Sequence, residues 1–307
     1  MDFIYSTDYL AWRLGPDHPT DPRRAARTLD LLRAAGVLDL DDVVAPRPAT
    51  RAEMELVHDP AYLDRLAAGH CTEWAGTRPE MFRTAAVMAG GTMLAVDRLL
   101  AGASDRAFNP AGAKHHAHRG SASGFCVLND MAMAAHRLAA AGLRVLYVDW
   151  DAHHGDGVEE LTADSDQVMT VSIHGHPMWP FTGTGHDQSR HILNYPLGPG
   201  ADGTDLLGAL DDALEKAAAF APDVVLLAAG ADGHREDPLS HLGYDVPAFA
   251  SAAARLDEFT WAHCGGRLIV GGAGGYRPED RTPQAWAAVF TTLATTTAAA
   301  APAARPT

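Results

Sequence analysis

The chain has 307 residues, 47% of them hydrophobic and 21% charged, a composition that favours one large α/β domain over two small ones. Its formal net charge of -15 argues against a nucleic-acid binder, because contacts to phosphates need clustered lysine and arginine. Three cysteines without a CxxC pair favour a reducing cytoplasm over a disulfide framework, and no apolar run or basic leader predicts a membrane span or a signal peptide.

Apolar, β-rich runs alternate with helical patterns along the chain. We predict strands at 2–5, 143–149, 167–173, 223–229 and 267–271, and helices near 79–102, 129–141, 203–220, 246–263 and 282–296. This alternation is typical of parallel strands joined by crossover helices. The sequence therefore predicts a single-domain three-layer α/β/α fold with a mainly parallel central sheet at 1–296, and a flexible tail at 297–307. The segment 174–191 has no period and is predicted to be a long functional loop.

Two predicted strands are followed by possible metal ligands. Asp149, Asp151 and His153 follow one strand, and in an extended chain they would point to the same side. Asp232 follows a later strand; a lone aspartate there more often caps a helix, but two strand ends delivering such side chains together favour a ligand site. Two carboxylates and one imidazole with an open position suit catalytic zinc, so we predict Asp151, His153 and Asp232 as its ligands.

A histidine pair, His115 and His116, lies in a glycine- and serine-rich loop before the predicted helix at 129–141. Adjacent histidines could be metal ligands, a general acid/base pair or solvated loop residues, and the pair alone leaves these alternatives open. Asp149 and Asp156 are available to accept hydrogen bonds from the ring nitrogens, which is how catalytic imidazoles are oriented.

Four motifs follow one another in a distinctive order. They are HHAHRGSASGFCVLND, YVDWDAHHGDGVEE, LLAAGADGHREDP and GGAGGYRPE, with HPTDPRR and PEMFRTAAVMAGGTMLA before them. In these motifs the chain resembles the histone deacetylase superfamily, which includes acetylpolyamine amidohydrolases and bacterial acetoin-utilisation proteins. The resemblance covers nearly the whole chain, and it implies an arginase-deacetylase fold with residues 1–296 as the catalytic domain.

The resemblance also implies a role for the polar residues of the motifs. Zinc, or Fe2+ or Co2+ in its place, would be bound by the three ligands already predicted. The catalytic residues would be His115 held by Asp149, the general base His116 backed by Asp156, and Tyr276, which would bond to the substrate carbonyl. A structural K+ would be bound at Asp149, Asp151, His153, Ser172 and Ile173.

A narrow tunnel is implied as well, suited to the methylene chain of an acylated lysine or polyamine. The residues expected to line it are Gly124, Phe125, Trp179, Phe181, Leu239 and Gly274. Without the resemblance, Phe125 and Tyr276 would be interpreted as ordinary packed residues. Six further histidines of this half are interpreted as loop or rim residues, namely His174, His176, His186, His191, His234 and His241.

Several positions depart from the family pattern near the predicted site. His118 stands where lysine is usual, Ala273 where glycine is usual, and Lys114 where glycine or a bulky apolar residue is usual. A cation at Lys114, near the pocket floor, suggests the hypothesis that it favours release of a carboxylate product or an acyl group other than acetyl. Leu239 replaces a glutamate of a polyamine-selective relative, and the sequence around Glu73 offers no clear counterpart of a rim aspartate found in some eukaryotic members.

We therefore expect a zinc-dependent amidohydrolase that removes an acyl group from an amine such as ε-acyl-lysine, in a small molecule, peptide or protein. The alternatives are an acetylpolyamine amidohydrolase, a deacylase of a specialised metabolite, and a non-catalytic acyl-ligand binder. A ureohydrolase with two manganese ions is disfavoured, because the DxDxxDP pattern is missing after Ala229. No nucleic-acid or membrane partner is expected, and a homo-oligomer is compatible with the sequence.

Overall fold

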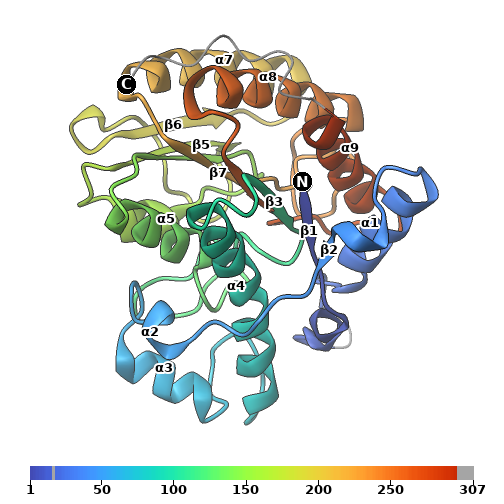
Figure 1. Ribbon diagram of the computed structural model, residues 1–307, viewed down its shortest axis with the longest axis vertical. Coiled ribbons are helices and arrows are strands. Elements are labelled where there is room, and N and C mark those ends of the chain that lie inside the picture. The colour runs from blue at the N-terminus through green and yellow to red at the C-terminus, as the bar shows by residue number, and fades with distance from the viewer. Residues whose placement is uncertain (16–17, 296–307) are drawn as a thin grey trace.

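The described residues of the computed structural model, 1–15 and 18–295, contain eight β-strands and nine α-helices (Figure 1). The strands are β1 (Asp2–Ile4), β2 (Val43–Val44), β3 (Arg106–Asn109), β4 (Val145–Asp149), β5 (Val168–Gly175), β6 (Ile192–Leu197), β7 (Val224–Ala228) and β8 (Leu268–Gly271). The helices are α1 (Arg23–Ala34), α2 (Arg51–Met54), α3 (Pro60–Ala67), α4 (Pro79–Leu100), α5 (Asp130–Ala140), α6 (Asp156–Thr162), α7 (Gly203–Phe220), α8 (Val246–Cys264) and α9 (Arg281–Thr295). The predicted tail at 297–307 lies outside the described residues.

All eight strands of the described chain form one sheet, in the order β2-β1-β3-β8-β7-β4-β5-β6. Every neighbouring pair is parallel. The five predicted strands are confirmed with shifted ends, and so is the predicted parallel sheet. A parallel strand needs a crossover connection to its neighbour, which is why helices separate most of the strands along the chain.

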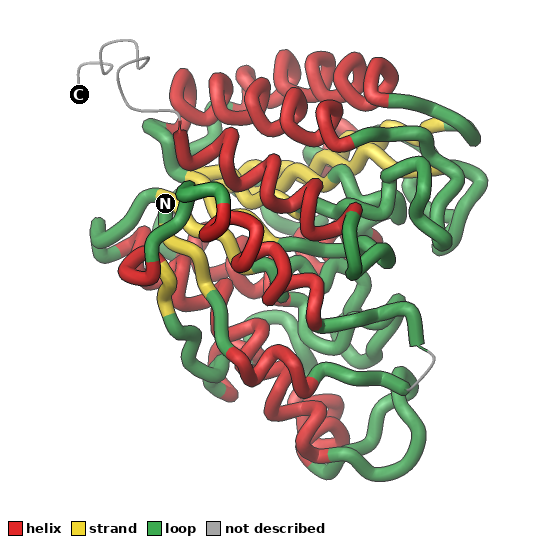
Figure 2. The backbone as a smooth tube through the Cα atoms, turned by 90° about the vertical axis from the view of Figure 1, so that its right-hand side faces the viewer, coloured by secondary structure: helices red, strands yellow, loops and turns green. Residues whose placement is uncertain are grey.

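The two faces of the sheet pack against different helices, as Figure 2 shows with the strands lying between two sets of helices. In β4, Leu146 and Val148 belong to a buried cluster with residues of α7, α8 and α9. Val145 and Tyr147 belong to a second cluster with residues of α4 and α5. Successive side chains of a strand point to opposite faces, so one apolar strand supplies both cores. None of the described helices is both long and apolar enough to cross a membrane.

The apolar pattern does not predict every element. β2 has two residues, β3 contains Arg106 and Asn109, and the edge strand β6 contains Asn194 and Pro196. Such strands lack an apolar run, and proline is tolerated at the edge of a sheet. The helices α1, α2, α3 and α6 are also missing from the sequence prediction. The predicted loop at 174–191 is shorter than expected, because β5 continues to Gly175.

The loops that carry the predicted site residues leave the sheet at one edge. The strands β3, β8, β7 and β4 are consecutive neighbours and parallel, so their carboxyl ends lie side by side. His115 and His116 follow β3, Tyr276 follows β8, Asp232 follows β7, and Asp151 follows β4. Ligands of open parallel sheets bind beyond these carboxyl ends, so the topology alone brings the five residues to one region.

A buried ion pair between β3 and α8 leads to a stability prediction. The side chains of Arg106 and Asp257 are 8% and 2% exposed, and Arg106 also donates to the carbonyl of Leu293 at 2.7 Å. Asp257→Ala would leave the guanidinium buried without its carboxylate, and we expect a loss of about 3–5 kcal/mol in the free energy of unfolding. Urea unfolding of the variant and the wild type measures this loss.

The matched control is Asp211→Ala, which breaks the exposed pair between Asp211 and Arg255. An exposed pair contributes less than about 1 kcal/mol, because water screens both charges. Equal losses in the two variants would contradict the importance assigned to the buried pair.

Candidate active site

Two carboxylates and one imidazole meet at the carboxyl edge of the sheet. The ligand atoms of Asp151, His153 and Asp232 all lie within 4.8 Å of one another. Both aspartates are buried, and His153 Nδ1 lies 3.2 Å from an Asp151 oxygen and 3.0 Å from an Asp232 oxygen. This donor set fits a divalent ion such as Zn2+, which takes imidazole nitrogen and carboxylate oxygen as ligands.

The chain bends as soon as β4 ends at Asp149. Asp149 Oδ1 accepts a hydrogen bond from the N–H of Asp151 at 2.9 Å, and Asp151 Oδ1 accepts one from the N–H of His153 at 2.9 Å. An aspartate that bonds the main chain two residues on forms a turn. The expectation that strand alternation aligns these three side chains is therefore wrong, because two consecutive turns bring Asp151 and His153 to the cluster.

Glycines leave room for the carboxylates of the cluster. A Cβ on Gly274 would lie 2.5 Å from Asp151 Oδ2 and closer still to an Asp232 oxygen. The N–H of Gly274 donates to Asp151 Oδ2 at 2.6 Å, and the N–H of Ala152 donates to Asp232 Oδ1 at 2.8 Å. Main-chain N–H groups thus orient both carboxylates. Because glycine has no side chain, the main chain at position 274 can approach them closely.

The cluster is charged and buried, so its protonation states depend on one another. Burial and the charge of Asp151 raise the pKa of Asp232 to about 6. Burial would lower the pKa of His153, but hydrogen bonds to Asp151 and Asp232 raise it to about 10. Burial would raise the pKa of Asp151, but the charges of His115 and His153 hold it well below its ordinary value. A divalent ion would replace the proton on His153, since metal ligands bind in their deprotonated forms.

Two histidine–aspartate pairs lie beside this cluster. His115 Nδ1 is 2.7 Å from Asp149 Oδ2, and His116 Nδ1 is 2.7 Å from Asp156 Oδ1. Each carboxylate is therefore hydrogen-bonded to Nδ1 of its histidine, and it makes no hydrogen bond with Nε2 of the same ring. This is the arrangement in which a carboxylate fixes the orientation of an acid/base histidine.

The surroundings give the two histidines different charges. Burial would lower the pKa of His115, but the charges of Asp149 and Asp151 raise it to about 9. Burial and the charge of His115 lower the pKa of His116 to about 3, although Asp156 opposes this. Near neutral pH, His115 is a cation and His116 a neutral ring that can accept a proton, a separation typical of acid/base pairs.

Tyr276 lies in the turn after β8. Its N–H donates to Asp237 Oδ2 at 2.7 Å, and its ring packs edge to face with Phe125 at a centroid distance of 6.0 Å. Burial and the charge of Asp232 raise the pKa of the phenol well above its ordinary value, so it keeps its proton. Among the described residues, none accepts a hydrogen bond from this hydroxyl, so it is available to a ligand.

A pocket of about 570 Å³ contains these catalytic candidates. Its lining includes His116, His153 and Tyr276, with Phe125 and Trp179 as aromatic walls. The Trp179 ring lies 4.7 Å from the His116 ring and 6.1 Å from the His153 ring between centroids. An apolar slot that ends in polar groups suits a ligand with a hydrocarbon stem and a reactive polar end.

Four of the six predicted tunnel residues line this pocket, namely Gly124, Phe125, Trp179 and Leu239. Gly274 instead lines a smaller cavity that also touches His116 and Tyr276. The prediction for Phe181 is wrong, because Phe181 is 64% exposed and does not line the pocket. A turn closed by the hydrogen bond from Phe181 N–H to the Met178 carbonyl, 2.8 Å, leaves Trp179 at the pocket and Phe181 in solvent.

Sequence reasoning missed two residues that support the histidine pairs. Tyr147 OH donates to Asp149 Oδ2 at 2.5 Å, and the two lie two residues apart on β4, a spacing that offered a signal. His118 lies 2.7 Å from a Glu160 oxygen and 3.5 Å from Asp156 Oδ2. The sequence held no signal for this contact, because it joins a loop to a helix that the pattern did not predict.

His174 is not a loop or rim residue, because it is buried in β5. Its Nδ1 lies 2.9 Å from Ser172 Oγ, and its Nε2 lies 3.1 Å from the Gly183 carbonyl. His154 binds the same loop, with Nδ1 2.8 Å from Thr182 Oγ1. The two histidines thus fix the position of the loop that carries Trp179.

The residues predicted to bind K+ lie next to one another. Ser172 pairs with Asp149 in the register of β4 and β5, and Ile173 follows it on β5. Asp151 and His153 lie in the turns directly after β4. The site remains a prediction, since main-chain carbonyls would supply several of its contacts.

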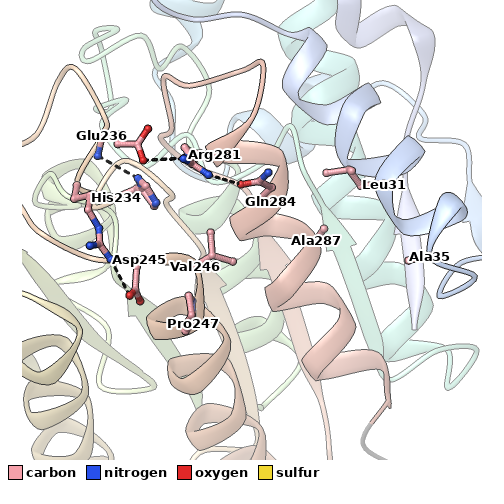
Figure 3. A pocket seen from close by; sticks show the side chains of 11 residues that line it. Leu31, Ala35, His234, Glu236, Asp245, Val246, Pro247, Arg281, Gln284 and Ala287 are labelled. Carbon is pink, nitrogen blue, oxygen red and sulfur yellow. Dashed lines mark hydrogen bonds and ion pairs between the residues drawn. The ribbon is translucent and has the colours of Figure 1, made fainter.

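A second pocket, of about 640 Å³, lies between α1, α8 and α9 (Figure 3). Its charged side chains pair with one another: Arg281 lies 2.9 Å from Glu236, and Arg235 lies 2.8 Å from Asp245. Within the described residues, the groups of possible metal ligands lie elsewhere. The greater volume of this second pocket therefore does not make it the better candidate for a catalytic site.

The chain is similar to several known proteins. The histone deacetylase domain pattern matches residues 18–293. The acetoin utilization protein AcuC of Bacillus subtilis (strain 168) is 35% identical over 94% of this chain and 80% of its own length. A crystal structure of an HDAC homolog from Aquifex aeolicus superposes with a TM-score of 0.84 at 31% identity, over 95% of this chain and 83% of the homolog. Acetylpolyamine aminohydrolase from Burkholderia pseudomallei superposes with a TM-score of 0.83 over 96% of this chain and 99% of its own; at 24% identity, this shows a shared fold only.

The glycine at position 274 gives a test of the candidate metal cluster. In Gly274→Ala the added methyl group would overlap carboxylate oxygens of Asp151 and Asp232. We expect the affinity for Zn2+ to fall by about tenfold to a hundredfold, the usual effect of disturbing groups that orient metal ligands. Competition with a chromophoric chelator measures the affinity.

The control is Gly208→Ala in α7, where an added Cβ meets nothing within 4 Å. Circular dichroism checks that both variants fold. Wild-type zinc affinity in folded Gly274→Ala would show that the close approach of this glycine is not needed to form the cluster.

Proposed function

The chain belongs to the histone deacetylase family, and we propose that it is a zinc-dependent deacylase of ε-acyl-lysine or of a similar small acylated amine. Family membership makes it a hydrolase of amide bonds, of the deacetylase type. The observation that supports the finer proposal is the cluster of Asp151, His153 and Asp232 in a pocket that also contains His116 and Tyr276.

Asp151, His153 and Asp232 would hold the metal ion. A divalent ion bound there would act as a Lewis acid and lower the pKa of a water ligand to roughly 7. Zn2+ suits this nitrogen and oxygen donor set, and Fe2+ or Co2+ could take the same ligands. We also propose a structural K+ beside the cluster, at Asp149, Asp151, His153, Ser172 and Ile173.

Two side chains have the positions and protonation states needed for amide hydrolysis. His116 is kept neutral by burial and by the charge of His115, so its unbonded Nε2 would accept the proton of the attacking water. Tyr276 keeps its proton and would donate to the acyl oxygen as negative charge develops there. The C–N bond then breaks, an imidazolium of the histidine pair gives a proton to the leaving amine, and the acyl group leaves as a carboxylate with the oxygen of water.

The walls of the pocket support an amine with a hydrocarbon stem. Phe125 and Trp179 flank the route to His153 and Tyr276, and neither aromatic ring offers a charge to a ligand. The methylene chain of an acylated lysine would lie between them, with its amide at the polar end. We propose a cytoplasmic location, supported by three cysteines that form no disulfide in the described chain.

Glu73 favours a second candidate, an acetylated polyamine. It lines the same pocket, and its carboxylate accepts the N–H of Phe125 at 2.9 Å. A carboxylate there could pair with a second ammonium group of a polyamine, whereas the apolar Leu239 offers no such contact. Comparison of kcat/KM for acetylputrescine and for an acetyl-lysine peptide separates the two candidates, and a higher value for acetylputrescine would favour the polyamine.

Metal removal tests the proposed chemistry directly. Dialysis against a strong chelator should abolish hydrolysis of a fluorogenic acetyl-lysine amide, because nothing else in the pocket would activate water to the same extent. Added Zn2+ should restore the rate, and Fe2+ and Co2+ are compared at equal occupancy. Full turnover in protein shown to be metal-free by elemental analysis would rule out the proposal.

The roles of the general base and of the phenol give a second test. His116→Ala and Tyr276→Phe should each lower kcat by about 10²-fold or more, because each removes one proton transfer or one donor to the developing charge. Tyr195→Phe is the control, since the Tyr195 hydroxyl binds Asp212 at 2.7 Å outside the pocket. A loss below about tenfold in either site variant, with zinc content unchanged, would contradict the role assigned to that residue.

A further inference from the structure

Another pocket, of about 390 Å³, lies at the edge of the sheet opposite the candidate active site. Arg144 directly precedes β4, and Met169 and Leu193 are the second residues of β5 and β6, so the pocket lies at the amino ends of these strands. The end of α7 contributes Ala219 and Phe220. Small-molecule sites usually have volumes of roughly 300–1,000 Å³, so this pocket is large enough for a ligand.

The inner wall of this pocket is apolar. Met169, Leu193 and Phe220 are 7%, 2% and 5% exposed, and all three belong to the buried cluster that includes residues of α7. Each of them also lines the pocket, so this part of the core can be reached from it. The apolar wall would cover the hydrocarbon part of a ligand, because removing apolar surface from water is favourable.

Arg144 is held against this apolar wall. Its Nε donates to the Phe220 carbonyl at 2.7 Å, and its guanidinium lies 4.1 Å from the centre of the Phe220 ring. The nearby carboxylate of Asp223 accepts the main-chain N–H of Arg144 at 2.8 Å instead of pairing with the guanidinium. Within residues 1–15 and 18–295, neither terminal nitrogen of Arg144 has an acceptor. A fixed guanidinium with two free donors matches the paired oxygens of a carboxylate or a phosphate.

Two more polar side chains of the pocket have no partner in the part of the chain that the structure describes. Gln188 begins the short 3-10 helix Gln188–Arg190, and its side-chain amide makes no hydrogen bond there. His191 follows this helix, and its ring packs on the Phe220 ring at a centroid distance of 5.1 Å while both ring nitrogens stay unbonded. Three polar side chains without partners thus line one pocket, an arrangement typical of ligand sites.

The charge of the pocket is opposite to that of the whole chain. Its charged lining residues are Arg144 and Lys216, and no aspartate or glutamate is among the described residues that line it. The chain as a whole has 39 acidic and 24 basic residues. Lys216 already pairs with Asp212, which also accepts the Tyr195 hydroxyl at 2.7 Å. Arg144 is therefore the cation of this pocket that lacks an anion among the described side chains.

We propose that this pocket binds a small organic anion, whose carboxylate or phosphate pairs with Arg144 and whose hydrocarbon part lies against the apolar wall. An inorganic anion would leave the apolar wall uncovered, and a neutral apolar ligand would leave the guanidinium without an acceptor. Gln188 and His191 would supply further hydrogen bonds to the ligand. The inference does not depend on the proposed function, because the pocket shares no lining residue with the candidate active site.

The first arm of the test is isothermal titration calorimetry of the zinc-loaded protein with benzoate, benzamide, acetate and phenyl phosphate. We expect benzoate to bind at least about tenfold more tightly than the neutral benzamide, since a charge-assisted hydrogen bond is worth that much. Benzoate should also bind at least about tenfold more tightly than acetate, because acetate has no ring to cover the apolar wall. Whichever of benzoate and phenyl phosphate binds more tightly identifies the carboxylate or the phosphate as the preferred group.

The second arm locates the binding site. In Arg144→Gln the ratio of the benzoate to the benzamide affinity should fall to about one, because the charged donor is gone. The matched control is Arg255→Gln, which removes an exposed arginine paired with Asp211 outside the pocket and should leave the ratio unchanged. The titration is repeated after removal of the metal, since a carboxylate held by zinc would lose its affinity and one held by Arg144 would keep it.

An anion preference that needs Arg144 and persists without zinc supports the proposal. Binding of none of the four probes, equal affinities for benzoate and benzamide, or a preference that survives in Arg144→Gln overturns it. Benzoate binding that disappears with the metal also overturns it. If circular dichroism shows that Arg144→Gln does not fold, the exposed variant Gln188→Ala replaces it: weaker benzoate binding then supports the site, and unchanged binding contradicts it.

Discussion

The candidate site depends on one geometric constraint, the parallel order of neighbouring strands in the sheet. Because β3, β8, β7 and β4 are adjacent and run in the same direction, the segments that follow them leave the sheet at the same edge. Each strand then contributes a different kind of group: a histidine pair, a phenol, and carboxylates with an imidazole. Segments more than a hundred residues apart in the sequence therefore meet there.

Burial at that edge makes the charges interdependent. Asp149 and Asp151 hold a proton on His115, and the resulting cation lowers the pKa of His116, which lies at a ring distance of 3.9 Å. Two carboxylates of the candidate metal cluster face one imidazole, and main-chain N–H groups fix the orientation of both carboxylates. A neutral imidazole, a protonated phenol and a cluster of possible metal ligands thus arise from one arrangement of opposite charges in a poorly solvated place.

Where the sequence prediction failed, the cause was a contact between distant segments or a turn. Asp151 and His153 were chosen for strand alternation, yet two aspartate turns bring them to the cluster. Phe181 and Trp179 are equally aromatic and two residues apart, and only the turn between Met178 and Phe181 decides which one lines the pocket. His174 was assigned to a loop because periodicity does not show that β5 extends beyond residue 173.

The α/β class, the five apolar strands, the family resemblance and the residue types at the strand ends all follow from local patterns and motifs, so they could be predicted from the sequence. Long-range contacts had to be seen in the folded chain: Lys114 and Arg24 line the same two small cavities, Tyr147 and His118 support the histidine pairs, and Trp179 rather than Phe181 forms the pocket wall. Hydrophobic periodicity records only which side of an element is buried. The partner of a buried charge depends on the crossover connections that bring distant segments together, and periodicity does not record them.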